Sequence, residues 1–270
     1  MAGIDIGLVG GLTMCQLLGM NSKQPASVQF SLDGFVRRGG ETDHHADGWG
    51  IAFFADKQCR VFTDSQPSIS SPLVDSLRSQ SIKSNNVIAH VRKATRGDVS
   101  DANCHPFTRH LWGKQWAFAH NGTLEAYAPA LSGSYVPTGE TDSEAAFCYI
   151  LQQLRDYFGC RAPSLKALMA KLQALSADIA QSGSFNYLLS DGKHLFAHCT
   201  TDLCAVNRQA PFGEAQLIDC EAVIDLSRHN QPDDCMTVIA TKPLTHNEDW
   251  ELFSPGELKL FVRGREYASA

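Results

Sequence analysis

Met14-Cys15-Gln16-Leu17-Leu18-Gly19-Met20 has the pattern of a translation start that lies thirteen residues inside the sequence. Methionine is removed readily when the next side chain is small, so a chain that starts at Met14 would mature to one that opens on Cys15. Such a residue carries a thiol and a free α-amine, which is a nucleophile beside its own base. An α-amine titrates near pH ~8 and an unperturbed thiol near ~8.5, so the two groups can exchange a proton close to neutrality. The segment therefore predicts an N-terminal cysteine nucleophile that leads into a strand.

Residues 1–13 are mildly apolar, are interrupted by glycines, carry Asp5 and lack a basic region. This pattern does not fit a secretory signal. We interpret residues 1–13 as an extension that comes from an upstream mis-start, an expression scar or a short pro-segment. Residues 14–270 are interpreted as a single domain, because a chain of 270 residues with 43% hydrophobic content can bury a full core.

Composition excludes several classes of partner. The 29 acidic and 23 basic residues give a formal net charge of -6, and the sequence has no long basic run, so we expect no nucleic-acid or anionic-membrane partner. No apolar run approaches the ~20 residues that a membrane span needs. The nine cysteines are an odd number without a CxxC pair, which is typical of a reduced, cytoplasmic protein rather than a disulfide-stapled one.

Hydrophobic periodicity predicts strands first, then two adjacent helices, then strands again. The expected strands begin at Cys15 and cover 48–55, 59–62, 86–94, 115–120, 185–190, 195–200, 203–207, 236–241 and 258–263. The expected helices cover 27–38, 73–77, 141–158 and 163–179, the third opening on a capping box at Thr141 and the fourth burying Leu165, Leu168, Leu172, Leu175 and Ile179. Hairpins dominate and no βαβ unit repeats, so the pattern favours antiparallel α+β layers.

A series of short motifs follows Cys15 in a fixed order. They are Arg38-Gly39, Asp47-Gly48-Trp49-Gly50, Ile88-Ala89-His90-Val91-Arg92-Lys93-Ala94-Thr95, His120-Asn121-Gly122 and Thr141-Asp142-Ser143-Glu144. Together with Cys15 they resemble the class II glutamine amidotransferases, and within them the YafJ-type branch. The resemblance runs from Cys15 to Phe158 by motif. It implies an N-terminal-nucleophile (Ntn) hydrolase fold, a four-layer αββα sandwich of two antiparallel sheets.

The resemblance also implies catalytic roles. The sulfur of Cys15 would attack the side-chain amide carbon of glutamine, and the tetrahedral oxyanion that forms needs fixed donors about 3 Å away. The side-chain amide of Asn121 and the backbone N–H of Gly122 would be those donors. In isolation Asn-Gly is also a strong signal for a hairpin turn.

Substrate contacts are implied at the same motifs. Arg92 would hold the substrate α-carboxylate in a bidentate pair, with the Thr95 hydroxyl beside it, although Arg92 could instead face outward from its strand. Asp142 would accept the substrate α-ammonium, although an acid is favoured in the first turn of any helix.

Arg38 and Gly39 match the arginine-glycine pair that lies beside the nucleophile in the family. Arg38 could alternatively be a charge at the C-terminal end of a helix.

Two clusters suggest metal ligands, namely His44, His45 and Asp47, and then Cys104 with His105. Neither has paired spacing such as HExxH or CxxC. We therefore expect no metal site, and the family resemblance implies no cofactor.

The leading hypothesis is a hydrolase that splits glutamine through a Cys15 thioester and releases ammonia and glutamate. A separate synthase subunit would accept the ammonia, because no synthase motif follows the glutaminase motifs. The alternatives are a stand-alone γ-glutamyl amidohydrolase, a non-catalytic ligand-binding or regulatory domain in which Cys15 is blocked, and a papain-like hydrolase that uses Cys104.

Overall fold

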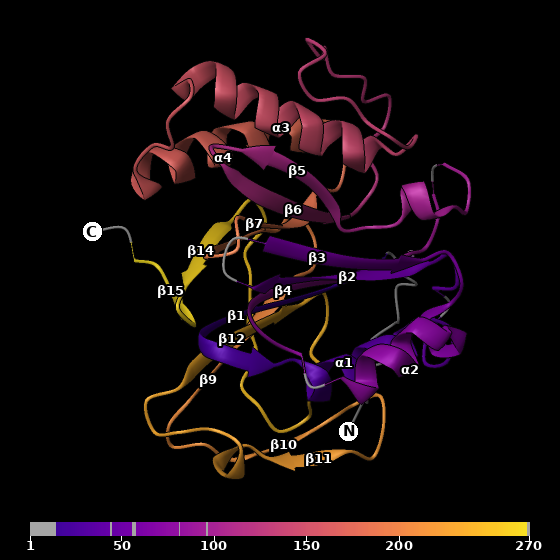
Figure 1. The fold of residues 1–270 in the computed structure, drawn as a ribbon, viewed down its shortest axis with the longest axis vertical. Coiled ribbons are helices and arrows are strands. Elements are labelled where there is room, and N and C mark those ends of the chain that lie inside the picture. The colour runs from indigo at the N-terminus through magenta and orange to yellow at the C-terminus, as the bar shows by residue number, and fades with distance from the viewer. Residues whose placement is uncertain (1–14, 44, 56–57, 81, 96, 269–270) are drawn as a thin grey trace, which may run out of the picture.

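The fold of the computed structural model consists of two large antiparallel sheets that lie face to face between two layers of helices (Figure 1). The structure describes residues 15–268 except 44, 56–57, 81 and 96. Met14 and the 1–13 extension therefore lie outside the described residues, as does His44. All strand pairings recorded among the described residues are antiparallel.

The first sheet has seven strands in the order β13-β9-β12-β1-β4-β2-β3. They are β1 (Gln16–Ser27), β2 (Trp49–Ala55), β3 (Gln58–Asp64), β4 (Lys83–Val91), β9 (Cys204–Gln209), β12 (Cys235–Ala240) and β13 (Glu251–Leu252). The strand that follows Cys15 is thus central, with β12 on one side and β4 on the other.

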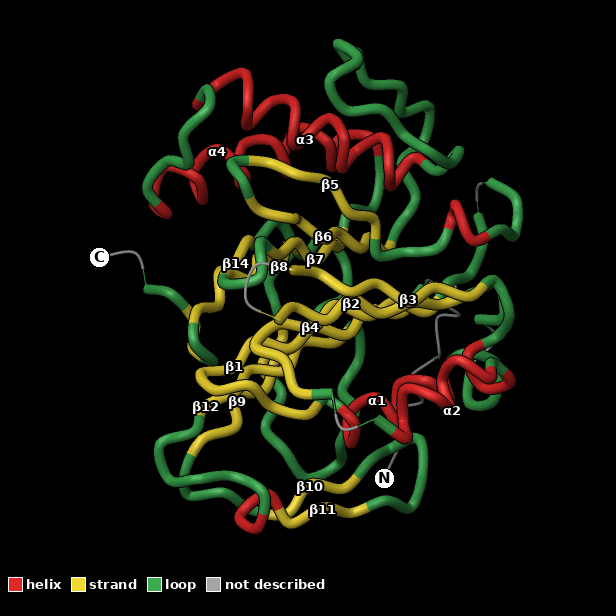
Figure 2. Tube along the Cα trace, viewed as in Figure 1, coloured by secondary structure: helices red, strands yellow, loops and turns green. Residues whose placement is uncertain are grey.

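The second sheet has six strands in the order β15-β14-β8-β7-β6-β5. They are β5 (Phe107–Leu111), β6 (Lys114–Asn121), β7 (Asn186–Ser190), β8 (His194–His198), β14 (Leu258–Val262) and β15 (Arg265–Glu266). A separate ribbon of β10 (Glu214–Gln216) and β11 (Val223–Asp225) lies at the end of the molecule remote from α3 and α4 (Figure 2).

Helices cover the outer face of each sheet. The six-stranded sheet carries α3 (Asp142–Phe158) and α4 (Leu165–Ile179), and the seven-stranded sheet carries α1 (Gln29–Phe35) and α2 (Pro72–Ser79) (Figure 1). Short 3₁₀ turns are η1 (Val36–Arg38), η2 (Ser68–Ser70), η3 (Asp101–Asn103), η4 (Ala180–Ser182) and η5 (Leu226–Arg228). Within the described part of the chain, no helix combines the length and the apolar character needed to cross a bilayer.

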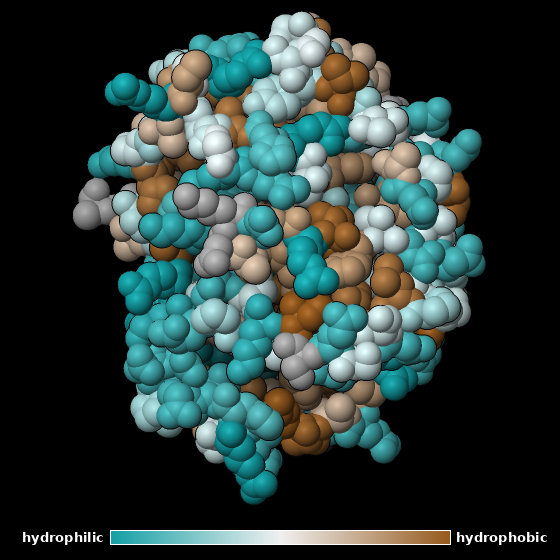
Figure 3. Space-filling model, viewed as in Figure 1, coloured by the Kyte–Doolittle hydropathy of each residue, from teal (hydrophilic) through white to brown (hydrophobic). Residues whose placement is uncertain are grey.

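Strand alternation divides the core into three layers. In β1, Leu18 and Met20 pack toward the helices, whereas Leu17 packs between the two sheets. The predicted four-layer αββα sandwich is therefore confirmed. On the face shown in Figure 3 the surface is mainly hydrophilic, with apolar residues in separate groups.

Local predictions were accurate at the third helix and less so elsewhere. α3 begins at Asp142, and the Thr141 hydroxyl accepts a hydrogen bond from the Glu144 backbone at 3.1 Å, as the capping box predicts. Leu165, predicted to be buried, is only partly so because it lies in the first turn of α4. Ser27 ends β1 rather than beginning a helix, and the loop expected before 115 contains β5.

Candidate active site

Register places two separate segments beside the start of β1, which follows Cys15. Gln16 pairs with Val91, so the residues that follow β4 run beside Cys15. On the other side of β1, the Leu17 carbonyl accepts from the Thr241 N–H at 3.1 Å. The Leu17 N–H in turn donates to the Thr241 hydroxyl at 2.9 Å. The end of the central strand therefore has fixed neighbours on both sides.

The Cys15 thiol lies against the backbone of Lys93. Its sulfur accepts from the Lys93 N–H at 3.1 Å and its S–H points to the Lys93 carbonyl at 3.2 Å. Burial raises the pKa of Cys15 to about 11, although the Lys93 hydrogen bond and the Arg92 charge oppose the rise. The thiol in this structure is therefore a weaker acid than the unperturbed value assumed from sequence, and it needs a base to become a nucleophile.

The segment that contacts Cys15 is itself held in place by Asp47 and Arg92. The Asp47 carboxylate accepts from the Ala94 N–H at 2.8 Å, and the Asp47 N–H donates to the Arg92 carbonyl at 3.2 Å. Arg92 is buried, with its guanidinium donating to the carbonyls of Gly97 and Asp98 at 3.1 and 3.0 Å. The outward-facing alternative for Arg92 is therefore wrong.

Asn121 ends β6 and is fully buried. Its side-chain nitrogen donates to the Thr241 hydroxyl at 3.1 Å, and its side-chain oxygen has no partner among the described residues. A Cβ on Gly122 would lie 2.0 Å from the Ser184 carbonyl oxygen, so only glycine fits there. The hairpin-turn alternative is wrong, because β6 pairs next with β7, which lies beyond both long helices in the chain.

Asp142 joins the loop after β6 to the start of α3. Its carboxylate accepts from the Leu124 N–H at 2.6 Å and from the Ser143 N–H at 2.9 Å. The same loop reaches Thr95, whose hydroxyl accepts from the Thr123 hydroxyl at 3.2 Å. Hydrogen bonds therefore link the loops that carry the three predicted substrate contacts Arg92, Thr95 and Asp142.

Arg38 bonds to several protein groups close to Gln16, the residue that follows Cys15. It forms a buried ion pair with Asp219 at 2.9 Å and donates to the Gln16 side chain and to the carbonyls of Lys242 and Pro243. Arg38 ends η1, as the alternative expects, and its charge is in addition paired with Asp219. A Cβ on Gly39 would lie 1.8 Å from the Ser68 hydroxyl oxygen, so a side chain there would displace that hydroxyl from its hydrogen bond to the Val36 carbonyl.

Cys104, the nucleophile of the papain-like alternative, is in an unsuitable setting. Its thiol is buried and donates to the carbonyls of Ser100 and Asp64 at 3.4 and 3.6 Å. Burial raises the pKa of Cys104 to about 11. The recorded partners of this thiol in the described part of the chain are backbone groups and no histidine ring, so the base that the papain-like alternative needs is not bonded to Cys104.

The pairing of two buried histidines beside the site was not predicted. His90 is visible in the sequence as a polar residue in an apolar strand, and His105 was considered only as a metal ligand. The His90 and His105 rings lie 4.2 Å apart, and none of their ring nitrogens has a hydrogen-bond partner among the described residues. Burial lowers the pKa of both histidines well below the usual value. Both rings are therefore neutral in the folded protein near pH 7.

This pair predicts a loss of stability in acid. Below about pH 6.5 the unfolded chain binds a proton at each ring that the folded chain does not, so the free energy of unfolding falls as pH falls, by up to ~1.4 kcal/mol per pH unit for each histidine. Urea unfolding at pH 7.5 and 5.5 measures the slope. We expect His105→Phe to make it shallower and His110→Gln, at an exposed position, to leave it unchanged. Equal slopes for His105→Phe and the unsubstituted chain would contradict this interpretation.

Comparison with known proteins assigns the family. Residues 14–270 match the model of the family described as Glutamine amidotransferases class-II. The chain belongs to this family. It is 47% identical to the protein YafJ of Escherichia coli (strain K12) over 251 residues, which are 93% of this chain and 98% of YafJ.

Solved structures give the same assignment for this family member. The 2.0 Å crystal structure of a predicted glutamine amidotransferase from Pseudomonas aeruginosa PA01 is 39% identical, with a TM-score of 0.75 over 94% of this chain and 100% of that chain. A glutamine aminotransferase class-II domain protein from Silicibacter pomeroyi, 16% identical, shares the fold with a TM-score of 0.56 over 94% of this chain and 100% of that one. These comparisons confirm the predicted family and its Ntn-hydrolase fold, whereas the roles of individual residues stay predictions.

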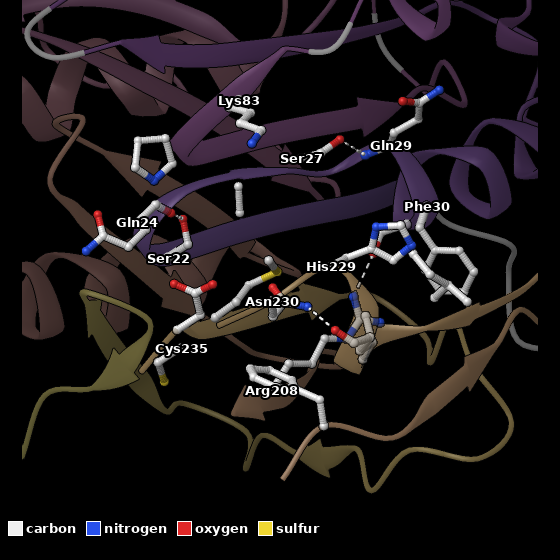
Figure 4. Close-up of a pocket in the computed structure, with 18 of the residues that line it drawn as sticks. Ser22, Gln24, Ser27, Gln29, Phe30, Lys83, Arg208, His229, Asn230 and Cys235 are labelled. Atoms are coloured by element: carbon white, nitrogen blue, oxygen red, sulfur yellow. Dashed lines mark hydrogen bonds between the residues drawn. The ribbon is translucent and has the colours of Figure 1, made fainter. Parts of the chain in front are cut away.

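A cavity of about 930 Å³ lies away from this site (Figure 4). Its walls include Ser22 and Ser27 from the second half of β1, and Ser22 is roughly 20 Å along the strand from Gln16. The buried Arg208 in its wall is neutralised by a bidentate pair with Glu248 at 2.7 Å. None of the residues predicted for the active site lines this cavity.

Proposed function

We propose that this family member hydrolyses the side-chain amide of glutamine through a Cys15 thioester, releasing ammonia and then glutamate. The observation that carries the proposal is the link between Asn121 and β1, the strand that follows Cys15. The Thr241 hydroxyl bonds both the Leu17 N–H and the Asn121 side chain, so the strand that follows the predicted nucleophile and the predicted oxyanion donor share one hydrogen-bonding group. A nucleophile and an oxyanion donor held together in this way are what acyl transfer from an amide requires.

The chemistry requires a chain that begins at Cys15. Its free α-amine would take the thiol proton during attack and return it to the leaving ammonia, and would then activate the water that cleaves the thioester. The pKa of about 11 for the half-buried thiol supports the need for such a base. An amide-linked Cys15 has no basic α-nitrogen, so in that form the domain would be non-catalytic.

The clamp for the amino-acid end of the substrate would use Arg92, Thr95 and Asp142. The Arg92 guanidinium would pair with the α-carboxylate, and the Thr95 hydroxyl would donate to the same group. The Asp142 carboxylate would accept from the α-ammonium while keeping its bond to the Leu124 N–H. Arg38 and Gly39 would act beside the nucleophile, Arg38 by holding Gln16 in place.

The alternative substrate is a γ-glutamyl amide or peptide in place of glutamine. The same residues would hold its γ-glutamyl group, and only the leaving amine would differ. If glutamine is the substrate, we propose that a separate synthase subunit accepts the ammonia.

Activity of protein with a mass-verified Cys15 N-terminus tests the proposal. We expect ammonia release from glutamine, its loss in Cys15→Ala, and a mass increase of a single adduct at Cys15 with a glutamine-like electrophile. Faster release of amine from γ-glutamyl peptides than of ammonia from glutamine would favour the alternative substrate. Hydrolysis that survives in Cys15→Ala would exclude Cys15 as the nucleophile.

The clamp makes a prediction about binding. Arg92→Lys removes the planar fork and Asp142→Asn removes the charge while keeping an acceptor for Leu124, so we expect each to raise KM by about 10-fold or more with little change in kcat. Steady-state kinetics with glutamine measure both parameters. The clamp assignment fails if these variants lower kcat and leave KM unchanged.

A further inference from the structure

We propose that Thr241 is a positioning residue that orients the carboxamide of Asn121, so that the nitrogen rather than the oxygen faces the reacting amide. This inference rests on the proposed function for its kinetic consequence, and its structural part can be tested without activity. Thr241 follows β12 and is buried, yet the sequence motifs give it no role.

With the Asn121 carboxamide oriented as in the structure, the Thr241 hydroxyl accepts two hydrogen bonds and donates none that is recorded. Its hydroxyl oxygen accepts from the Leu17 N–H at 2.9 Å and from the Asn121 side-chain nitrogen at 3.1 Å. No acceptor for the hydroxyl proton is recorded in the described part of the chain. The side-chain oxygen of Asn121 is meanwhile buried without a partner among those same residues. One proton without an acceptor and one acceptor without a proton thus lie on adjacent side chains.

A half-turn of the Asn121 carboxamide pairs these two groups with each other. The oxygen and nitrogen of a carboxamide have nearly the same shape, so the two orientations are distinguished by their hydrogen bonds. After the turn, Thr241 still accepts from the Leu17 N–H and donates its proton to the Asn121 oxygen. The Asn121 nitrogen then occupies the position where the unpartnered oxygen now lies, and its protons have no recorded acceptor among the described residues until a substrate oxygen supplies one.

The turned orientation is also the one that the reaction needs. An oxyanion is stabilised by donors and repelled by a carbonyl oxygen, so an unpartnered oxygen at this position would oppose attack by Cys15. The backbone of Asn121 is fixed independently, because its carbonyl accepts from the Asn186 side chain at 2.9 Å. Thr241 is therefore the group that selects which end of the Asn121 carboxamide faces the substrate.

Neutron diffraction from crystals of the exchanged protein tests the orientation directly. We expect a deuteron on the Thr241 oxygen that points to the Asn121 oxygen, and two deuterons on the Asn121 atom that faces away from Thr241. Deuterons on the Asn121 atom nearest Thr241 would overturn the inference. This result does not depend on whether glutamine is the substrate, so failure of the proposed function and failure of the inference are distinguishable.

Kinetics supply the second test, in protein with a verified Cys15 N-terminus. Thr241→Val keeps the shape but can neither donate nor accept, and we expect kcat for glutamine to fall by about 10-fold or more with KM unchanged. Thr241→Ser should restore kcat. The matched control is Thr237→Val in β12, which loses a buried hydroxyl bonded to the Gly264 carbonyl and has no recorded bond to Asn121.

The outcomes separate positioning from simple stability. Melting temperatures should fall in both valine variants, whereas only Thr241→Val should lose kcat. Thr241→Val protein that keeps full kcat, or a loss of kcat as large in Thr237→Val, would overturn the inference.

Discussion

Protein that begins at Met1 should hydrolyse glutamine about 10²- to 10⁴-fold more slowly than protein that begins at Cys15. The factor is the contribution of a positioned general base, which an amide-linked Cys15 does not have. The half-buried thiol, with a pKa of about 11, makes that base more important than it would be for an exposed cysteine. Turnover by the two forms, each verified by intact-protein mass spectrometry, measures the difference.

The pH dependence of kcat/KM is the control for this prediction. In the Cys15 form kcat/KM should rise with pH as the α-amine loses its proton near pH ~8, because only the free amine accepts the thiol proton. Acetylation of the α-amine should reduce the rate to that of the Met1 form. Equal turnover by the Met1 and Cys15 forms would show that the α-amine is not the base.

The sequence was sufficient where local rules govern the structure. The capping box at Thr141 set the start of α3, and the order of strands, helices and strands gave the layered architecture. Motif order also identified the family. Residues such as Asn121 and Asp142 could be singled out because their short motifs are contiguous in the chain.

The supporting contacts could not be predicted, because they depend on strand register and on segments far apart in the chain. Thr241 follows an ordinary strand, and only the pairing of that strand with β1 brings Thr241 to Leu17 and Asn121. Asp219, the ion-pair partner of Arg38, lies in a loop with no motif of its own. The Asp47 contact to Ala94 was similarly hidden, although its Asp-Gly-Trp-Gly motif was visible.

Asn121→Ala should lower kcat for glutamine by about 10²- to 10³-fold while changing KM little. Removing one oxyanion donor typically costs about 2.7–4 kcal/mol of transition-state stabilisation, and the ground-state amide carbonyl gains much less from the same donor. The clamp variants at Arg92 and Asp142 should show the opposite pattern, with KM raised and kcat little changed. Steady-state kinetics of all three variants under one set of conditions measure this contrast.

Stability must be separated from catalysis in this experiment, because Asn121 is fully buried and its loss leaves the Thr241 hydroxyl without one partner. Asn86→Ala is a matched control. Asn86 is an equally buried asparagine that donates to the Gly192 carbonyl at 2.7 Å, and it lies in β4, five residues before Val91. Both variants should unfold more easily, but only Asn121→Ala should lose turnover. If Asn86→Ala lowered kcat as much, the effect of Asn121→Ala would be a consequence of destabilisation, and Asn121 would not be the oxyanion donor.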